Sequence, residues 1–339
     1  MKKHHNILLG HGSGGKLTHD LIEQLFASRF SNPILAQHGD SALLPSSTDM
    51  ITFTTDSFVV DPVVFPGGNI GHLAVAGTVN DLAVSGATPR YLSAGFIIEE
   101  GFPMATLELI VETMANEARK AGVLIVTGDT KVVDKGKCDK IFINTSGIGF
   151  LSADRNHISG GSRIQPGDKI IINGSIGDHG MAIMAARNDL KISTEITSDC
   201  ACLNHLIETA LDGCSEIKFM RDATRGGLGT VLSELVAGKP YGLLVDETRI
   251  SVRNNVRGLC EMLGFDPLYV ANEGKVVMVV GEREADAVFS RLKEHPLGAN
   301  AAIIGEITQS HPGMAWLDTL VGGKRIIEML SGEQLPRIC

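Results

Sequence analysis

The stretch DRNHISGGSRIQPGD, residues 154–168, divides the sequence into two halves. It is polar, and its Gly160-Gly161 and Pro166-Gly167 pairs are typical of turns between structural elements. On both sides of it, short apolar runs alternate with longer segments of helical periodicity. At roughly 150 residues per domain, 339 residues also suggest two domains. We therefore expect two successive domains, each mixing helices and strands.

The first half shows the clearest periodicity. Strands are predicted at 51–55, 91–98, 123–126 and 141–149, and helices at 70–84 and 106–120. Thr106 is the expected N-cap of the second helix and Gly122 its C-cap. A further helical stretch follows Lys16, because Leu17, Leu21 and Leu25 fall on one face.

The second half repeats this alternation. Strands are predicted at 169–173, 268–271 and 276–280, and helices at 181–186 and 228–236. Gly322-Gly323 separates two apolar runs and predicts a hairpin. The resulting division is a glycine-rich segment at 1–35, an N-terminal domain at 36–155, a C-terminal domain at 156–330 and a flexible tail at 331–339.

Composition excludes several classes of protein. The net charge of −9 and the 5% aromatic content argue against binding to nucleic acid or to anionic membranes. The longest segment without acidic or basic residues, 62–80, contains proline, histidine and four glycines, so it is not a membrane span. Six cysteines without a secretory signal indicate reduced thiols and a cytoplasmic protein. Glycine is enriched, at about 11–12% against about 7% on average, which is common in phosphate-handling enzymes.

The segment from Gly10 to Lys16 nearly matches two phosphate-binding motifs. Gly10-x4-Gly15-Lys16 is a Walker A motif that has Leu17 where the motif has serine or threonine. Gly10-x-Gly12-x2-Gly15 also satisfies the dinucleotide fingerprint. A phosphate-contacting loop and a flexible leading segment both remain open.

Asp56, Asp81 and Asp129 share a setting. Each lies at the end of an apolar element or beside a glycine. Mg²⁺ prefers carboxylate oxygens together with nucleotide phosphates, so the three predict a Mg–ATP site. The alternative is that each caps a turn or a helix.

The cysteines suggest two different functions. Cys200-x-Cys202-x2-His205, with Cys214 downstream, invites a zinc site, but the same residues fit an amphipathic helix that begins near Ser198. Cys339 is the last residue, and the adjacent α-carboxylate raises the pKa expected for its thiol. It is therefore better suited to carry a group between sites than to act as an activated nucleophile. The alternative is an incidental tail residue.

Seven motifs, taken together, resemble one known family. They are HGSGGK (11–16), TTDS (54–57), NDLA (80–83), TGDTKV (127–132), DATRGGL (222–228), ANEGK (271–275) and LPRIC (335–339). In this order, and across essentially the whole chain, they closely resemble the HypE family of maturation proteins for nickel–iron hydrogenases. That family belongs to the superfamily of aminoimidazole ribonucleotide synthetase and selenophosphate synthetase. The resemblance implies an α/β fold of the α+β type, with two aminoimidazole ribonucleotide synthetase-like domains and dimerisation through the N-terminal sheet.

The resemblance also implies a reaction. HypF transfers a carbamoyl group to the terminal cysteine, here Cys339. ATP and Mg²⁺ then drive dehydration of this S-carboxamide to a thiocyanate, and the cyano group passes to iron on the HypC–HypD complex. By the same resemblance, Asp56, Asp81 and Asp129 match the Mg–ATP carboxylates, and Asn272 belongs to the nucleotide site.

Lys131 and Glu273 match the residues that act on the carboxamide. Lys131 follows Asp129 by two residues, so both side chains point to the same side of a strand. Glu273 follows a predicted strand of the other domain, so Lys131 and Glu273 can meet only across a cleft. An interdomain ion pair is the alternative interpretation.

Two other functions compete. One is a different ATP-dependent enzyme of the superfamily, such as selenophosphate synthetase, which places a reactive cysteine or selenocysteine near the glycine-rich loop. The nearest cysteine here is Cys138. The other is a non-catalytic scaffold or metal carrier that uses His11, Cys200 and Cys202.

Overall fold

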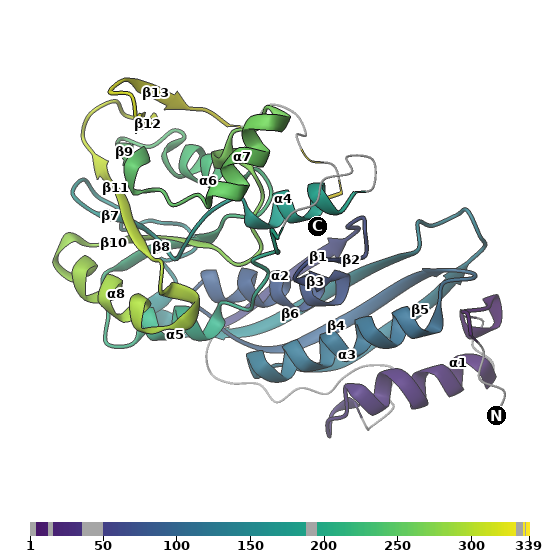
Figure 1. The fold of residues 1–339 in the computed structure, drawn as a ribbon. Helices are drawn as coiled ribbons and strands as arrows, with labels where there is room; N and C mark the ends of the chain where they lie inside the picture. The colour runs from purple at the N-terminus through teal and green to yellow at the C-terminus, as the bar shows by residue number, and fades with distance from the viewer. Residues whose placement is uncertain (1–4, 13–15, 36–49, 188–194, 330–334, 336) are drawn as a thin grey trace.

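Two large sheets form the framework of the molecule. The computed structural model describes residues 5–12, 16–35, 50–187, 195–329, 335 and 337–339. Its first half contains a four-stranded sheet and its second half a seven-stranded sheet. Residues 152–168 connect the two through turns and a short 3-10 helix, Ala153–Arg155. The mixed α/β architecture with two domains is therefore confirmed (Figure 1).

The N-terminal sheet has one covered face and one open face. Its strand order is β1 (Met50–Phe58), β6 (Ile141–Leu151), β4 (Thr88–Glu99) and β5 (Leu124–Val133). Only β4 and β5 pair in parallel. The covered face packs on α2 (Ile70–Val84), α3 (Met104–Ala121) and the N-terminal helical segment, α1 (Lys16–Leu21) with the π-helical Ile22–Ala27. On the open face, Ile51 is 60% exposed, Phe53 69% and Ile97 45%.

Helix α2 lies at the centre of the molecule. Asn69 begins it by accepting hydrogen bonds from the backbone N–H groups of Gly71 (2.9 Å) and His72 (3.3 Å). Most of its residues are apolar and they occur on all sides of the helix, which is the pattern of a buried helix; thirteen of its fifteen residues are buried. It packs on β1 and β6 on one side and on elements of the C-terminal domain on the other. The predicted boundaries of this helix, 70–84, are confirmed.

The C-terminal sheet is covered on both faces. Its strand order is β13 (Lys324–Ile327), β12 (Ala315–Asp318), β9 (Gly242–Asp246), β11 (Ala302–Thr308), β7 (Lys169–Ile172), β10 (Val276–Val280) and β8 (Ile217–Asp222). Helix α6 (Gly227–Val236) packs on one face, and α5 (Asn204–Leu211) and α8 (Glu282–Glu294) pack on the other. All five residues of β10 are buried, as expected of a central strand.

The remaining two helices lie near the domain junction. They are α4 (Asp178–Ala186) and α7 (Asn254–Leu263). In Figure 1 the C-terminus lies between the two domains, below α4 and beside β1 and β2 (Val64–Phe65), which pairs with β3 (Gly68–Asn69). The end of the chain therefore reaches the junction rather than the outer surface.

Several expected boundaries differ from the structure. Helix α3 begins at Met104 after Pro103, so Thr106 is not its N-cap, whereas Gly122 ends it in the left-handed conformation as predicted. The strand predicted at 268–271 is wrong, because Pro267–Tyr269 forms a 3-10 helix whose start is capped by Asp266. The hairpin around Gly322-Gly323 is confirmed by the antiparallel pair β12 and β13.

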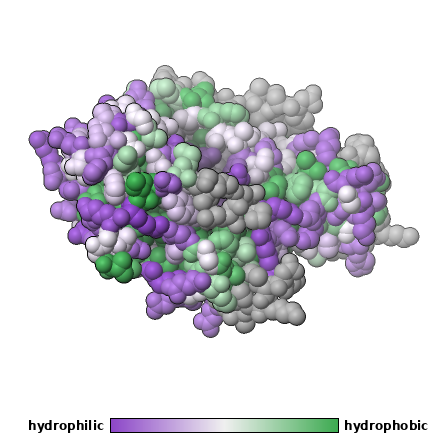
Figure 2. Space-filling model, turned by 90° about the horizontal axis from the view of Figure 1, so that it is seen from above, coloured by the Kyte–Doolittle hydropathy of each residue, from purple (hydrophilic) through white to green (hydrophobic). Residues whose placement is uncertain are grey.

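Within the described ranges, every helix is too short or too polar to cross a bilayer. Hydrophilic residues cover much of the face in Figure 2, and hydrophobic residues form only small groups on it.

Close packing of α2 on α3 yields a stability prediction. A Cβ on Gly71 would lie 2.5 Å from the Ile110 carbonyl oxygen, so Gly71→Ala forces the two helices apart. We expect it to lower the free energy of unfolding by about 1–3 kcal/mol. In Gly258→Ala, the matched control in α7, the new Cβ meets nothing within 4 Å. That change should stabilise by roughly 0.5–1 kcal/mol. Denaturant titration of both variants measures this, and equal effects would contradict the packing argument.

Candidate active site

Half-buried carboxylates from both domains face one another at the junction. Asp56, near the end of β1, and Asp81, in α2, come from the N-terminal domain. Thr54 Oγ1 donates to Asp81 Oδ2 at 2.9 Å, and Ser57 N donates to Asp56 Oδ1 at 2.8 Å. Burial raises the pKa of both carboxyl groups, and the charge of Asp56 raises the pKa of Asp81 further.

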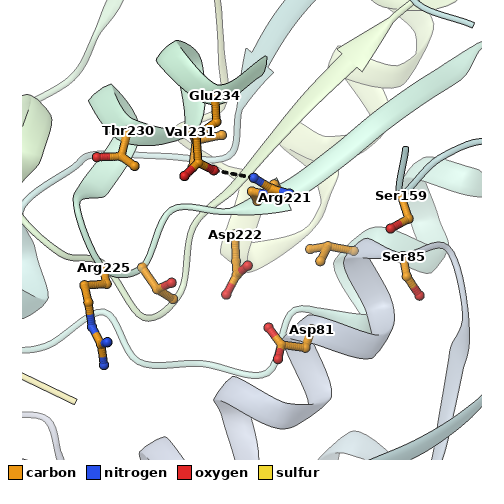
Figure 3. Close-up of a pocket in the computed structure, with 11 residues that line it drawn as sticks. Asp81, Ser85, Ser159, Arg221, Asp222, Arg225, Thr230, Val231 and Glu234 are labelled. Atoms are coloured by element: carbon orange, nitrogen blue, oxygen red, sulfur yellow. Dashed lines mark hydrogen bonds and ion pairs between the residues drawn. The ribbon is translucent and has the colours of Figure 1, made fainter. Parts of the chain in front are cut away.

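Asp222 extends this group from the C-terminal domain. It ends β8, and burial together with the charges of Asp81 and Asp56 raises its pKa to about 7. In Figure 3, Asp222 and Asp81 point toward one another across a pocket of about 300 Å³. Arg221 and Arg225 also line this pocket. The site therefore contains several carboxylates and two arginines, and the arginines compensate the negative charge only in part.

Glu273 is more deeply buried than the other three carboxyl groups of the site. Its side chain is only 3% exposed, and burial raises its pKa well above the ordinary value. The charges of Asp222, Asp199, Asp56 and Asp81 act in the same direction. A carboxyl group with a raised pKa is suited to accept a proton near neutral pH. Glu273 thus sits in the electrostatic field of the whole cluster.

Asp129 and Lys131 lie elsewhere in the same chain. The Lys131 ammonium is 3.6 Å from Asp129 Oδ1, so the two side chains share a side of β5, as predicted. They pair with Gly95 and Ile97 on the open face, whereas Asp56 points to the covered face. β5 is also three strands from β1, roughly 14 Å at the usual strand spacing. One chain therefore brings Asp56, Asp81 and Glu273 together without Asp129 or Lys131.

Two buried asparagine amides join segments at or near the domain junction. Asn272 is fully buried: its Oδ1 accepts from Gly177 N at 2.8 Å and its Nδ2 donates to Ala223 O at 2.8 Å. Asn80 Oδ1 accepts from Leu203 N at 2.7 Å, and its Nδ2 donates to Ala201 O at 3.0 Å. Asn272 thus joins loops within its domain, while Asn80 joins α2 to the C-terminal domain. All the polar side-chain atoms of Asn272 are engaged by the protein.

The described tail residues pack into the junction. Leu335 is 8% exposed and Ile338 3%, and both belong to an apolar cluster that includes residues of α4. Val59 N donates to the main-chain oxygen of Cys339 at 3.0 Å. Arg337 forms an ion pair with Asp139. Residues 335 and 337–339 of the tail are thus in contact with both domains in this structure.

The seated tail delivers the Cys339 thiol to the cleft. Arg225 Nη2 lies 3.5 Å from Cys339 Sγ. Burial raises the pKa of this thiol to about 11, and the charge of Glu273 raises it as well, while Arg225 opposes the shift. The pKa of the thiol is raised, as expected from the sequence, but the main cause is burial rather than the adjacent α-carboxylate. At neutral pH the thiol is protonated and a weak nucleophile.

The other cysteines do not assemble a metal centre. Across the described ranges, no three His, Cys, Asp or Glu side chains are arranged to hold a metal ion. His205 Nε2 bonds to the Lys120 carbonyl oxygen, and Cys214 Sγ donates to Glu284. All six cysteines are free of disulfides. Helix α5 starts at Asn204 rather than near Ser198.

The predicted glycine-rich loop is only partly described. Leu9–Gly12 form a 3-10 helix, and residues 13–15 lie outside the described ranges. His11 is buried, with its Nδ1 3.0 Å from the Leu8 N–H.

Asp222 and Arg225 were missed as individual site residues. Both lie in DATRGGL, one of the seven motifs that carry the family resemblance, just before helix α6. The signal was the pairing of an acid and a base immediately before two glycines, at the end of a buried strand.

Comparison with known proteins gives a consistent result. Residues 38–151 match the family described as AIR synthase related protein, N-terminal domain, and residues 165–316 match its C-terminal domain. The carbamoyl dehydratase HypE of Rhodobacter capsulatus is 50% identical over 335 residues, 98% of each chain. A crystal structure of the hydrogenase maturation protein HypE in complex with ATP has a TM-score of 0.92 at 48% identity, covering 98% of this chain and 99% of that one. A HypE–HypF complex has a TM-score of 0.79 at 48% identity, covering 91% and 99%.

The raised pKa of Cys339 makes its reactivity predictable. Because alkylation requires the thiolate, the rate of iodoacetamide modification should keep rising through pH 10. At pH 8 it should be roughly two hundredfold slower than for a cysteine in urea-unfolded protein, whose ordinary pKa is about 8.5. The mass of the tail peptide reports the reaction. A rate that levels off near pH 9 in the folded protein would contradict the burial of this thiol.

Proposed function

Because the chain belongs to the HypE family of carbamoyl dehydratases of hydrogenase maturation, we propose that its substrate is an S-carboxamide carried on its own Cys339. The product is a thiocyanate, which supplies a cyanide ligand for hydrogenase iron. The observation that carries this proposal is the position of the Cys339 thiol, which is half-buried at the domain junction beside Arg225 and in the field of Glu273.

The chemistry requires an activated oxygen and a base. A carboxamide oxygen is a poor leaving group, so it must first be phosphorylated and then leave as phosphate. The carbamoyl nitrogen loses both protons as S–C≡N forms: one goes to the base and then to solvent, and the other leaves on the phosphate. The overall change is ATP plus carboxamide to ADP, phosphate, thiocyanate and one proton. Glu273 is the base for the nitrogen proton in this proposal, because its raised pKa makes it a stronger base than an exposed carboxylate.

The residues of the cleft fit Mg²⁺ and ATP. Burial raises the pKa of all three carboxyl groups; the charge of Asp56 raises the pKa of Asp81 further, and the charges of both raise the pKa of Asp222. A bound cation would stabilise the charged form of such a group. Mg²⁺ uses few protein carboxylates and completes its shell with water and phosphate oxygens, so no preformed three-residue cage is required. Bound Mg–ATP would supply the phosphoryl group. The Arg225 guanidinium would then attract negative charge beside the thiol. Asn272 would hold the neighbouring loops in place through its hydrogen bonds.

Asp129 and Lys131 reach the reaction from a second subunit in this proposal. The open face of the N-terminal sheet exposes Ile51, Phe53 and Ile97, as a dimer interface would. Face-to-face pairing of two such sheets brings the β5 edge of one subunit toward the other. Lys131 would then neutralise charge on the phosphoryl group of its partner's site.

Two protein partners follow from the same proposal. HypF loads the carbamoyl group, supported by the structure of a related HypE with HypF, and the HypC–HypD complex accepts the cyano group. The six free cysteines are compatible with a cytoplasmic reaction.

The proposed carboxylates can be tested through nucleotide binding. Asp56→Asn, Asp81→Asn and Asp129→Asn each remove a charged oxygen ligand, so Mg–ATP affinity should fall roughly tenfold or more. Loading of Cys339 by HypF should continue. Isothermal calorimetry measures the affinity, and the control is Asp286→Asn, which changes an exposed residue of α8. If all three variants bind Mg–ATP as tightly as the control, these aspartates are ordinary caps.

A mixing experiment tests Glu273, Lys131 and the dimer together. Glu273→Gln and Lys131→Ala should each accept carbamoyl on Cys339 yet retain it as the carboxamide, because proton removal or phosphoryl transfer is lost. When equal amounts of the two variants exchange subunits, every mixed dimer contains one intact site. Dehydration should return to about a quarter of the wild-type rate.

The readout is the mass of the tail peptide, which falls by one water. Full dehydration by either variant alone refutes its catalytic role. No recovery after verified subunit exchange refutes the shared site.

A further inference from the structure

Helix α4 presents two side chains to the tail. His179 is completely buried, and its Nε2 lies 2.8 Å from the Ile338 carbonyl oxygen. At the end of the same helix, Arg187 Nη2 donates to the Arg337 carbonyl oxygen at 3.1 Å. Both groups contact the main chain of the tail, so they do not depend on which side chains the tail carries.

The protonation of His179 is fixed by its surroundings. A carbonyl oxygen can only accept, so Nε2 must carry the hydrogen and donate to Ile338. Ser198 Oγ lies 2.8 Å from Nδ1 and itself accepts from Cys200 N at 3.1 Å, which leaves its hydroxyl hydrogen free to donate to Nδ1. Burial lowers the pKa of His179, so the ring is neutral. The ring is therefore oriented at both nitrogens and has one hydrogen aimed at the tail.

The N-terminal domain holds the other side of the tail. Val59 N donates to the main-chain oxygen of Cys339, and Asp61 N donates to the Arg337 oxygen at 3.3 Å. The carbonyl oxygens of residues 337, 338 and 339 thus all accept from the body of the protein. His179 makes the bond to the middle one, for which the described residues supply no second donor.

A hydrophobic anchor precedes these bonds. Leu335 packs beside Gly180, where a Cβ would lie 3.1 Å from Leu335 Cδ1. The residue next to His179 thus leaves the space that this leucine fills. We call the arrangement of tail residues 335 and 337–339 against α4 and residues 59–61 the tail seat.

We propose that His179 is a positioning residue for the dehydration: by holding the Ile338 carbonyl it keeps the tail in its seat, with the Cys339 sulfur beside Arg225. It touches no reacting atom. The seat itself rests on the contacts above, and its catalytic consequence rests on the proposed function.

Two substitutions of the same residue separate this role from general packing. His179→Leu fills a similar volume and removes the donor. His179→Gln can place an amide N–H near the position of Nε2 and retains it. In the leucine variant, iodoacetamide should modify Cys339 about tenfold faster, because losing a buried hydrogen bond favours the unseated tail. Dehydration of preloaded protein should slow by a similar factor, while loading by HypF stays equal or rises. The glutamine variant should remain within about threefold of wild type in the rates of Cys339 modification, dehydration and loading.

A matched control changes a histidine elsewhere. His157 is buried, and its Nε2 lies 3.0 Å from the Ile217 carbonyl oxygen, far along the chain from any tail contact. His157→Leu should leave the modification rate of Cys339 unchanged. An increase equal to that of His179→Leu would mean that loss of any such bond loosens the protein, and would overturn the proposal.

A tail-side variant covers the case in which His179→Leu does not fold. Leu335→Ala removes the anchor and leaves every contact within the body intact, so it should also expose Cys339 and slow dehydration. Wild-type rates in Leu335→Ala, or in a folded His179→Leu, overturn the seat. Modification needs neither ATP nor HypF, so it tests the seat even if the proposed reaction fails. If modification responds and even the wild type does not dehydrate, the proposed function is wrong and the seat stands.

Discussion

Negative charge buried at the junction of two domains is the constraint on which the site depends. Glu273 is 3% exposed and lies in the field of Asp56, Asp81, Asp199 and Asp222. Such a group is costly unless cations or protons compensate it. Asp199 is balanced by Lys275 at 2.7 Å, which leaves the charge of the others for a ligand to neutralise. The domains can hold these groups close because neutral amides, such as that of Asn80, join the two sides.

The sequence was most informative where side-chain periodicity determines structure. Helix α2 and strand β10 are buried on all sides, so their apolar runs have clear ends, and both were predicted with their correct boundaries. The run at 268–271 was misread, because a short apolar segment after a proline can be buried in a 3-10 turn as well as in a strand. Glu273 therefore follows a turn and not a strand.

The site was predictable in its parts but not in its arrangement. Asp56 and Asp129 both looked like strand-end carboxylates, yet their strands continue past them and turn them to opposite faces of the sheet. Which face a residue takes depends on register and on a bulge between Leu92 and Ser93, and neither is visible in local pattern. The seating of the tail was also hidden, because main-chain carbonyl oxygens, which every residue possesses, make its hydrogen bonds.

The partial burial of Cys339 affects how readily its sulfur is oxidised. Oxidants such as peroxide attack thiolates, and a cysteine oxidised beyond the sulfenic acid is rarely recovered. A thiol with a pKa of about 11 presents almost no thiolate at neutral pH. The fold thus limits oxidative damage to this sulfur for as long as the tail is seated, and an unseated tail would lose that protection.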